Sequence, residues 1–125
     1  MGLVDKLRGN ASSADISTIQ QELAPILIEG ETVDQAFVFV RDQIILTNKR
    51  LIFVDKQGMT GKKRSYQSIP YSKITRFTAE TAGFMDTDAE LKLWIGSATE
   101  PIGIEISRSV GIQEVYKALS RHVLA

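Results

Sequence analysis

Hydrophobic residues recur at helical spacing near both ends of the chain. The N-terminal repeat follows a Ser-x-x-Asp pattern that resembles a helix capping box, and Pro25 disfavours helical backbone in the residue before it. We therefore predict a helix that begins near Ser13 and ends at Ala24. The C-terminal repeat has the i, i+3, i+4, i+7 spacing of an amphipathic helix. Its apolar members are Ile112, Val115, Tyr116, Leu119 and Val123.

Between the two predicted helices, hydrophobic residues alternate with polar ones or form short apolar runs, patterns that are typical of β-strands. Tight turns are indicated at residues 41–42 and 48–50, where Asn48 favours the left-handed backbone of a tight hairpin. Pro70 ends a later strand because it cannot donate to a strand ladder, and imperfect alternation after Ile74 predicts a β-bulge. The predicted strands cover residues 35–40, 44–47, 51–54, 64–69, 74–81, 90–95 and 102–106.

The first three predicted strands are apolar on both faces. We therefore expect a second sheet to cover one face and a helix or a partner to cover the other. Evenly spaced antiparallel strands indicate a mainly β sandwich or partly open barrel, and the C-terminal helix is expected to plug an open end. A chain of 125 residues fits a single globular unit. Within it, we predict that residues 1–28 form a helical extension packed on a domain at residues 29–125.

Four stretches of the sequence resemble the bacterial pleckstrin-homology-like (PH-like) family. They are Glu29–Val33, Val40–Asp42 leading into Leu46–Phe53, Ser68–Ile74 and Asp86–Gly96. The resemblance implies a PH-like barrel of two roughly orthogonal antiparallel sheets, of four and three strands, capped by the C-terminal amphipathic helix. It also implies self-association, often into rings, and it brings no catalytic residues.

Eukaryotic pleckstrin-homology domains that bind inositol phosphates carry a Lys-x-Lys/Arg-x-Arg cluster around the first hairpin. The corresponding hairpin here, at residues 39–44, has one basic residue, Arg41, beside one acidic residue, Asp42. Phosphoinositide binding is therefore not expected.

Charge is balanced over the whole chain, with 15 basic and 15 acidic residues, but it is divided by segment. Residues 49–76 contain eight basic residues and one acidic residue, whereas residues 77–105 contain six acidic residues and one basic residue. In a PH-like topology these two segments lie mainly in different sheets. Such a molecule suits head-to-tail contact between copies, which forms a ring when its rotation closes.

Composition and motifs exclude several activities. The absence of Cys removes thiol catalysis, disulfides and Cys-based metal sites. No apolar run approaches the ~20 residues of a membrane-spanning helix. The neutral charge and the lack of a recognisable module argue against nucleic-acid binding. Gly58–Lys63 fails as a phosphate loop because Lys occupies positions 56 and 63, where that motif requires Gly and Ser or Thr. We expect a cytoplasmic protein with no catalytic residue, cofactor or metal.

After these exclusions, the single histidine is the remaining candidate for catalysis and an acidic trio is the remaining candidate for metal binding. His122 lies in the last turn of the predicted C-terminal helix, where a favourable end-of-helix residue is a simpler interpretation than a general base. Asp86, Asp88 and Glu90 alternate but do not match an EF-hand loop. On a strand they would share one solvated face, and an adventitious or interface metal is the alternative.

A basic run and the only tryptophan are candidates for an interface. Lys62, Lys63 and Arg64 form either a solvated loop or a patch that binds an anion or a partner. Trp94 is predicted to point away from the core-facing residues of its strand. It is then either exposed at an interface or covered by the N-terminal helix.

Phe84 and Met85 form an apolar pair in a predicted loop, where they either pack locally or contact a neighbouring subunit. These features together predict a non-catalytic binding or scaffold module that forms homo-oligomers and acts through protein–protein contacts, with an unidentified protein partner also open. The alternative is a peripheral membrane adaptor that binds anionic lipid through the basic run. The candidate interface residues are Trp94, Lys62, Lys63, Arg64, Asp86, Asp88, Glu90, Phe84 and Met85.

Overall fold

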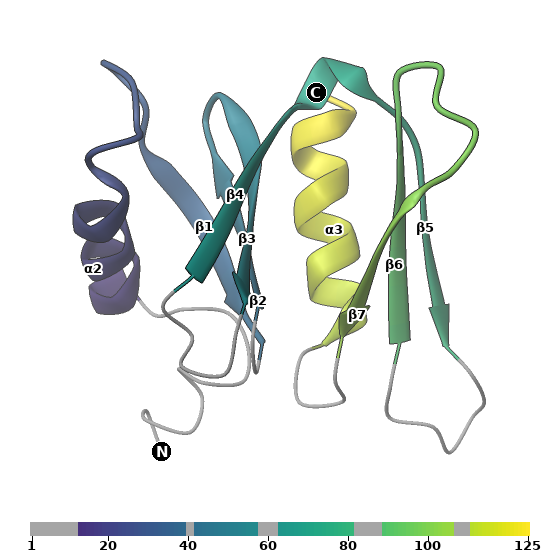
Figure 1. The fold of residues 1–125 in the computed structure, drawn as a ribbon, viewed down its shortest axis with the longest axis horizontal. Coiled ribbons are helices and arrows are strands. Elements are labelled where there is room, and N and C mark those ends of the chain that lie inside the picture. The colour runs from purple at the N-terminus through teal and green to yellow at the C-terminus, as the bar shows by residue number, and fades with distance from the viewer. Residues whose placement is uncertain (1–12, 40–41, 58–62, 82–88, 107–110) are drawn as a thin grey trace.

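The computed structural model describes residues 13–39, 42–57, 63–81, 89–106 and 111–125 (Figure 1). The elements in these residues are α2 (Ser13–Leu23), β1 (Val33–Val38), β2 (Asp42–Thr47), β3 (Arg50–Gln57), β4 (Lys63–Pro70), the 3-10 turn η1 (Tyr71–Lys73), β5 (Ile74–Thr81), β6 (Ala89–Ile95), β7 (Ile102–Ile106) and α3 (Ile112–Val123). Both predicted helices and all of the predicted strands are confirmed, with some strand ends displaced by a few residues.

The strands form two antiparallel sheets, the first in the order β1-β2-β3-β4 and the second in the order β5-β6-β7. Figure 1 shows α3 standing between the two sheets and α2 on the far side of the first sheet. The predicted bulge is present, because the pairing of β5 with β6 shifts register between Ile74 and Arg76. This is the expected mainly β architecture of four and three strands with a C-terminal helix.

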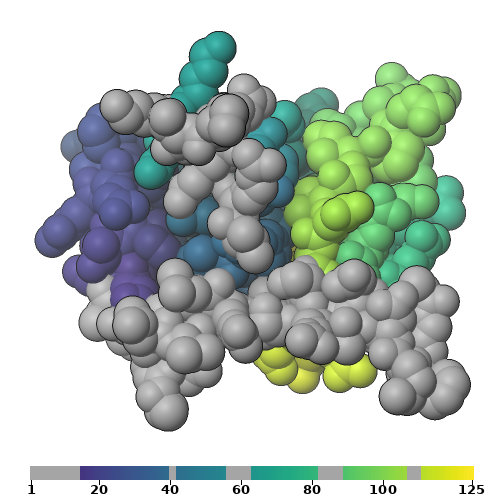
Figure 2. All heavy atoms as spheres, turned by 60° about the horizontal axis from the view of Figure 1, so that its bottom comes forward, coloured from purple at the N-terminus to yellow at the C-terminus, as the bar shows by residue number. Residues whose placement is uncertain are grey.

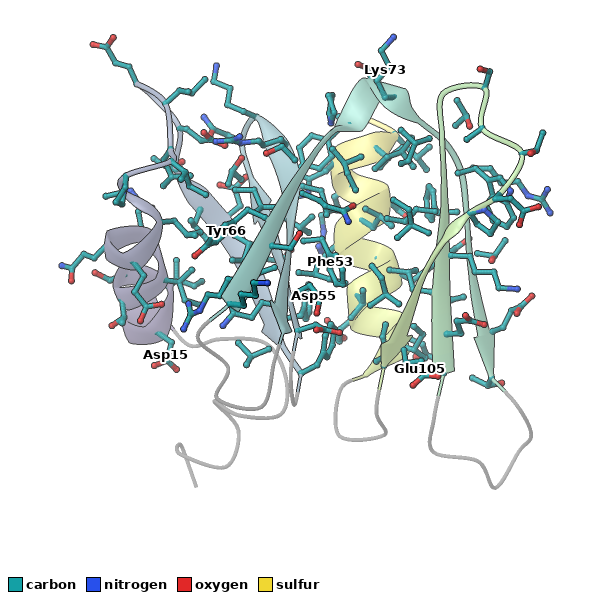
Figure 3. All side chains as sticks on the ribbon, in the orientation of Figure 1. Asp15, Phe53, Asp55, Tyr66, Lys73 and Glu105 are labelled. Carbon is teal, nitrogen blue, oxygen red and sulfur yellow. The ribbon has the colours of Figure 1, made fainter. Side chains whose placement is uncertain are left out.

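One apolar core fills the space between the two sheets and α3. Alternation along each strand sends every second side chain inward, so the facing surfaces of both sheets supply large aliphatic groups. Phe53 of β3, labelled in Figure 3, belongs to this core on the side of the sheet that faces α3. Other buried members of this core are Phe37, Ile44, Leu46, Leu51, Leu91, Leu93, Ile104, Val115 and Leu119.

A second, smaller apolar cluster lies between α2 and the outer face of the first sheet. Ile19 and Leu23 of α2 pack there on side chains of the first three strands, among them Ala36 and Ile52. The side-chain oxygen of Gln20 also accepts a hydrogen bond of 3.0 Å from the backbone N–H of Val33 at the start of β1. The two apolar faces expected for the first sheet are thus both covered, one by the main core and one by α2.

The turn between β2 and β3 forms where it was predicted, but the reason given for Asn48 was wrong. No described residue other than glycine has a positive φ, so Asn48 does not adopt the left-handed conformation. Its side chain instead accepts a 2.8 Å hydrogen bond from the Thr32 backbone and donates a 3.0 Å one to the Gly30 carbonyl. The Thr47 hydroxyl accepts hydrogen bonds from the backbone N–H groups of Lys49 and Arg50, each at 3.0 Å. Side-chain bonding, and not backbone chirality, closes this turn.

A buried ion pair anchors the same region. The Glu31 carboxylate accepts hydrogen bonds from Arg50 at both oxygens, at 2.9 and 3.0 Å. It also accepts the Thr47 hydroxyl at 2.6 Å and the Ile28 backbone N–H at 3.0 Å. Burial acts to raise the pKa of Glu31, but the hydrogen bonds and charge of Arg50, with those of Thr47 and Ile28, outweigh it and lower the pKa to about 2.

Replacing this carboxylate by an amide (Glu31→Gln) should lower the free energy of unfolding by about 2–3 kcal/mol at neutral pH, because Arg50 then lacks its buried counter-charge. The pKa of Glu31 is lower in the folded than in the unfolded chain, so its stabilisation is present above the ordinary value of 4.5 and is lost as pH falls toward about 2. Urea unfolding at a series of pH values measures the difference between wild type and variant, which should shrink with acidity. The exposed Glu22→Gln serves as control. If the difference in unfolding free energy between wild type and Glu31→Gln does not change with pH, the lowered pKa of Glu31 is contradicted.

Candidate functional site

The outer face of the three-stranded sheet carries the residues that best fit an interaction surface. On β6, Leu91 and Leu93 are fully buried in the core. Because successive side chains of a strand point to opposite faces, Lys92 and Trp94 lie on the outer face, as predicted. The register of β6 with its two neighbours then decides which side chains surround them.

Trp94 is half-buried on this face, beneath a cation. The Arg76 guanidinium of β5 lies 4.5 Å from the centroid of the indole ring, close enough for a cation–π interaction. Figure 2 shows α2 at one end of the molecule and the strands of the second sheet at the other. Of the two situations expected for Trp94, cover by this helix is therefore wrong, and an arginine from the neighbouring strand lies over the ring.

A row of three carboxylates crosses the same face. Glu80 of β5 is paired directly with Glu90 of β6, and Glu90 is paired directly with Glu105 of β7. The Lys92 ammonium lies 3.5 Å from Glu80 and 3.9 Å from Glu90, in contacts that are largely open to solvent. Like charges directly opposite one another destabilise a sheet, and one solvated lysine compensates this only in part.

The acidic surface therefore differs in its members from the predicted one. The trio of the sequence interpretation was Asp86, Asp88 and Glu90, of which Asp86 and Asp88 lie outside the described residues. The companions that the structure gives to Glu90 are Glu80 and Glu105, which are distant in sequence and meet through strand register. No short-range pattern in the sequence could have found them.

The basic run does not form a single-faced patch where it is described. Lys63 and Arg64 are both exposed, but they are the first two residues of β4 and so belong to opposite faces of the first sheet. Lys62 lies outside the described residues, as do Phe84 and Met85. Tyr66, further along β4, is exposed on the face that also carries α2 (Figure 3).

His122 joins α3 to the first sheet. Its Nδ1 atom lies 2.9 Å from the Ala118 carbonyl and its Nε2 atom 3.1 Å from a carboxylate oxygen of Asp34 on β1. The imidazole also packs at 4.9 Å, centroid to centroid, on the ring of Tyr71. These contacts fit the interpretation of His122 as a structural residue at a helix C-terminus.

Tyr71 is held in place on its other side. Its hydroxyl lies 2.6 Å from the Thr47 carbonyl and 2.8 Å from the Arg50 carbonyl. Burial, followed by the nearby charges of Asp34 and Glu31, raises the pKa of Tyr71 well above its ordinary value, so its proton stays in place at neutral pH.

A groove of about 540 Å³ runs between β5 and α3. The Phe77 and Tyr116 rings pack against each other there at 5.2 Å between centroids. Thr78, whose β-sheet partner is Lys92, has a buried hydroxyl oxygen with no hydrogen-bond partner among the described residues, although buried polar atoms in folded proteins are nearly always paired. The residues that line the groove are Phe77, Thr78, Ala79, Thr81, Ile112, Gln113, Tyr116 and Lys117.

Comparison with known proteins agrees with this architecture of two sheets closed by a C-terminal helix. The Bacterial PH domain family matches residues 2–123, which is nearly the whole chain, and the chain belongs to this family. The earlier resemblance is thereby confirmed.

Relatives support the assignment at the level of family and fold. The uncharacterized protein YjqA of Bacillus subtilis is 51% identical over 121 residues, covering 96% of this chain and 97% of that protein. The crystal structure of a pleckstrin homology domain from Shewanella amazonensis superposes with a TM-score of 0.87 at 48% identity, over 99% of this chain and 100% of that one. A DUF1696 family protein with a pleckstrin-homology domain from Shewanella loihica gives a TM-score of 0.78 at 41% identity, over 93% and 98%.

Two further observations concern the described part of the chain alone. No described helix is long and apolar enough to cross a membrane. The described residues also contain no group of three or more His, Cys, Asp or Glu side chains placed to hold a metal ion.

Removing the cation over the indole (Arg76→Ala) should expose Trp94, the only tryptophan of the chain. Trp94 fluorescence should shift to the red and be quenched more strongly by acrylamide, with a loss of about 0.5–1 kcal/mol in unfolding free energy. Arg121→Ala, at an exposed position of α3, is the matched control and should leave both signals unchanged. Unaltered quenching in Arg76→Ala contradicts the stacked arrangement in solution.

Proposed function

We propose that this protein is a non-catalytic scaffold module of the cytoplasm that acts by self-association and protein–protein contact. The observation that supports this most directly is the outer face of the second sheet. There an arginine-covered tryptophan stands beside a row of three carboxylates that carry only one lysine between them. A partner that brings positive charge relieves the repulsion within the row, and the aromatic residue supplies area for contact.

The distribution of charge over the fold favours a second copy of the same chain as that partner. β3, β4 and η1 lie in the segment with eight basic residues, and β6 and β7 lie in the segment with six acidic ones. Lys49, Lys63, Arg64 and Lys73 are exposed, and Figure 3 shows Lys73 projecting away from the molecule at η1. Contact between exposed basic residues of the first sheet or η1 of one copy and the acidic row of the next is head-to-tail, which generates a ring or a filament.

The environment of His122, the single histidine, also supports a binding role. His122 and Tyr71 are engaged with each other and with backbone carbonyls at the junction of α3 and the first sheet. Neither is among the described residues that line the groove, of which Lys117 alone is charged. The membrane-adaptor alternative has less support, because Lys63 and Arg64 belong to opposite faces of their sheet.

Self-association should weaken as salt screens charge. Light scattering coupled to size-exclusion chromatography should find assemblies at about 0.01 M ionic strength and smaller species at about 1 M, where the screening length falls from roughly 30 to 3 Å. Lys63→Glu/Arg64→Glu should shift low-salt material toward smaller species, and mixing with Glu90→Lys/Glu105→Lys should restore large assemblies.

Two outcomes contradict the proposal. One is a monomer of wild type at both ionic strengths. The other is salt-sensitive sedimentation of the wild type, but not of Lys63→Glu/Arg64→Glu, with phosphatidylserine vesicles, which favours the membrane adaptor. Glu22→Arg on α2 controls for a general effect of charge reversal, and it should assemble as the wild type does.

A further inference from the structure

The groove between β5 and α3 is hollow because its sheet wall contains a small residue between two larger ones. The β6 partners of Phe77 and Ala79 are buried in the main core, so both side chains lie on the inner face of β5, toward α3. Thr81 follows on the same face by strand alternation. The methyl group of Ala79 is exposed although it lies on this inner face, so the space between its two neighbours is open.

The helix wall of the groove consists of an apolar column beside a polar column. Ile112 and Tyr116 form the apolar column, because residues four apart lie on one face of a helix. Gln113 and Lys117 have the same spacing and form the polar column. Tyr116 is 40% exposed, although its ring packs on that of Phe77. An amide and an ammonium group therefore lie along one rim of an apolar groove.

The two walls run in opposite directions, which places the charge at one end of the groove. Figure 1 shows β5 and α3 running in opposite directions. The Phe77 ring packs on Tyr116, the residue next to Lys117, whereas Thr81 lies toward the start of α3. Phe77 and Thr81 are four residues apart on the strand, which corresponds to about 13 Å. The groove is therefore elongated, with its cation near one end and apolar walls along its length.

We propose that this groove binds a small amphipathic carboxylate of the medium-chain fatty-acid class. Its head lies at Lys117, and its hydrocarbon chain follows Ala79 toward Ile112. The groove volume of about 540 Å³ is within the range of small-molecule sites, which are mostly apolar with a few polar groups that fix orientation. The inference goes beyond the proposed self-association, which uses the outer face of the second sheet and not this groove.

Charge selects a ligand with a single negative group. Lys117 is the one charged side chain among the described lining residues, and no described carboxylate forms an ion pair with it. Its ammonium repels a cationic ligand. Phosphate groups are commonly held by arginine forks or by several converging donors, and the described lining has neither. A carboxylate needs less, because Lys117 pairs with its charge and the Gln113 amide, one turn away, donates to its second oxygen.

The shape and polarity of the walls select a hydrocarbon chain for the rest of the ligand. Phe77, Tyr116 and Ile112 present apolar surface along the groove, and Ala79 leaves the room between them. Burial of a methylene group in such surroundings strengthens binding by up to about fourfold. An extended chain covers these residues in sequence and removes the exposed part of Tyr116 from water.

Titration of the protein with octanoate tests the site directly. Calorimetry should give a dissociation constant on the order of a few mM, the affinity expected of so small a ligand. Affinity should rise from hexanoate to octanoate to decanoate by roughly threefold per methylene group. Shifts of backbone amide NMR signals should concentrate at residues 77–81 and 112–117. Absence of binding by the wild type, or shifts scattered over the whole protein, overturns the proposal.

The role of Lys117 is tested by comparing octanoate with octan-1-ol, which has the same chain and no charge. Lys117→Met should weaken octanoate about two- to fivefold, the effect of one exposed charge pair, and leave octan-1-ol unchanged. Gln113→Glu, another exposed change on α3, should also weaken octanoate alone because it adds a negative charge beside the head. Arg121→Met is the matched control, because Arg121 is exposed one turn further along α3 and does not line the groove. Equal octanoate affinity in Lys117→Met and the wild type overturns the carboxylate assignment.

Filling the hollow tests the place of the chain. Ala79→Phe should abolish the binding of both octanoate and octan-1-ol, because the new ring occupies the space of the hydrocarbon. Aromatic residues are favoured in strands, and circular dichroism verifies the fold of the variant. Unchanged binding by folded Ala79→Phe overturns the site. If Ala79→Phe does not fold, the smaller Ala79→Val should weaken both ligands by a common factor, and unchanged affinities overturn the site in the same way.

Failure of this inference can be told apart from failure of the proposed function. Wild type that binds octanoate but is monomeric at low and high salt retains the groove and overturns the scaffold proposal. Wild type that assembles in a salt-dependent way without binding octanoate retains the scaffold and overturns the groove.

Discussion

The buried Glu31–Arg50 pair is the interaction on which the rest of the architecture depends. Glu31 lies in the connector that follows α2, and Arg50 is the first residue of β3. The Arg50 guanidinium also donates a hydrogen bond of 2.8 Å to the hydroxyl of Ser68 on β4. The carbonyl of Arg50 also receives the hydroxyl of Tyr71, whose ring packs on His122 at the end of α3. The connector after α2, the first sheet, η1 and the end of α3 therefore meet at one end of the molecule through one connected polar cluster. A bidentate buried pair tolerates little displacement, so it specifies geometry as much as it adds stability.

Once that cluster and the two apolar clusters are in place, few surfaces are left for a partner. The first sheet is covered on both faces, by the main core and by α2. In the described part of the chain, the second sheet packs into the main core through its inner face. Burial of Leu91 and Leu93 requires Lys92 and Trp94 to lie on the opposite face. The exposed chemistry of the molecule is thus a direct consequence of how its core is packed.

Membership of the Bacterial PH domain family establishes the fold, whereas function depends on the side chains that each member exposes on that fold. Here the exposed outer face of the second sheet combines a tryptophan under Arg76 with three carboxylates in register. The carboxylate row has an energetic cost in the single chain, and the half-buried indole offers area for contact. The proposed self-association accounts for both features, because a partner that brings positive charge offsets the repulsion within the row and covers the indole.

The sequence alone was sufficient for the helix from Ser13, the strands, the bulge after Ile74 and the outward direction of Trp94, because helix and strand periods follow from local backbone geometry. It was not sufficient for the neighbours of those residues. Cover of Trp94 by Arg76, and the meeting of Glu80, Glu90 and Glu105, depend on cross-strand register between distant segments. Register is set by which side chains the whole core can bury, and a one-residue slip would turn every side chain of a strand to the other face. Only the assembled tertiary structure makes that choice.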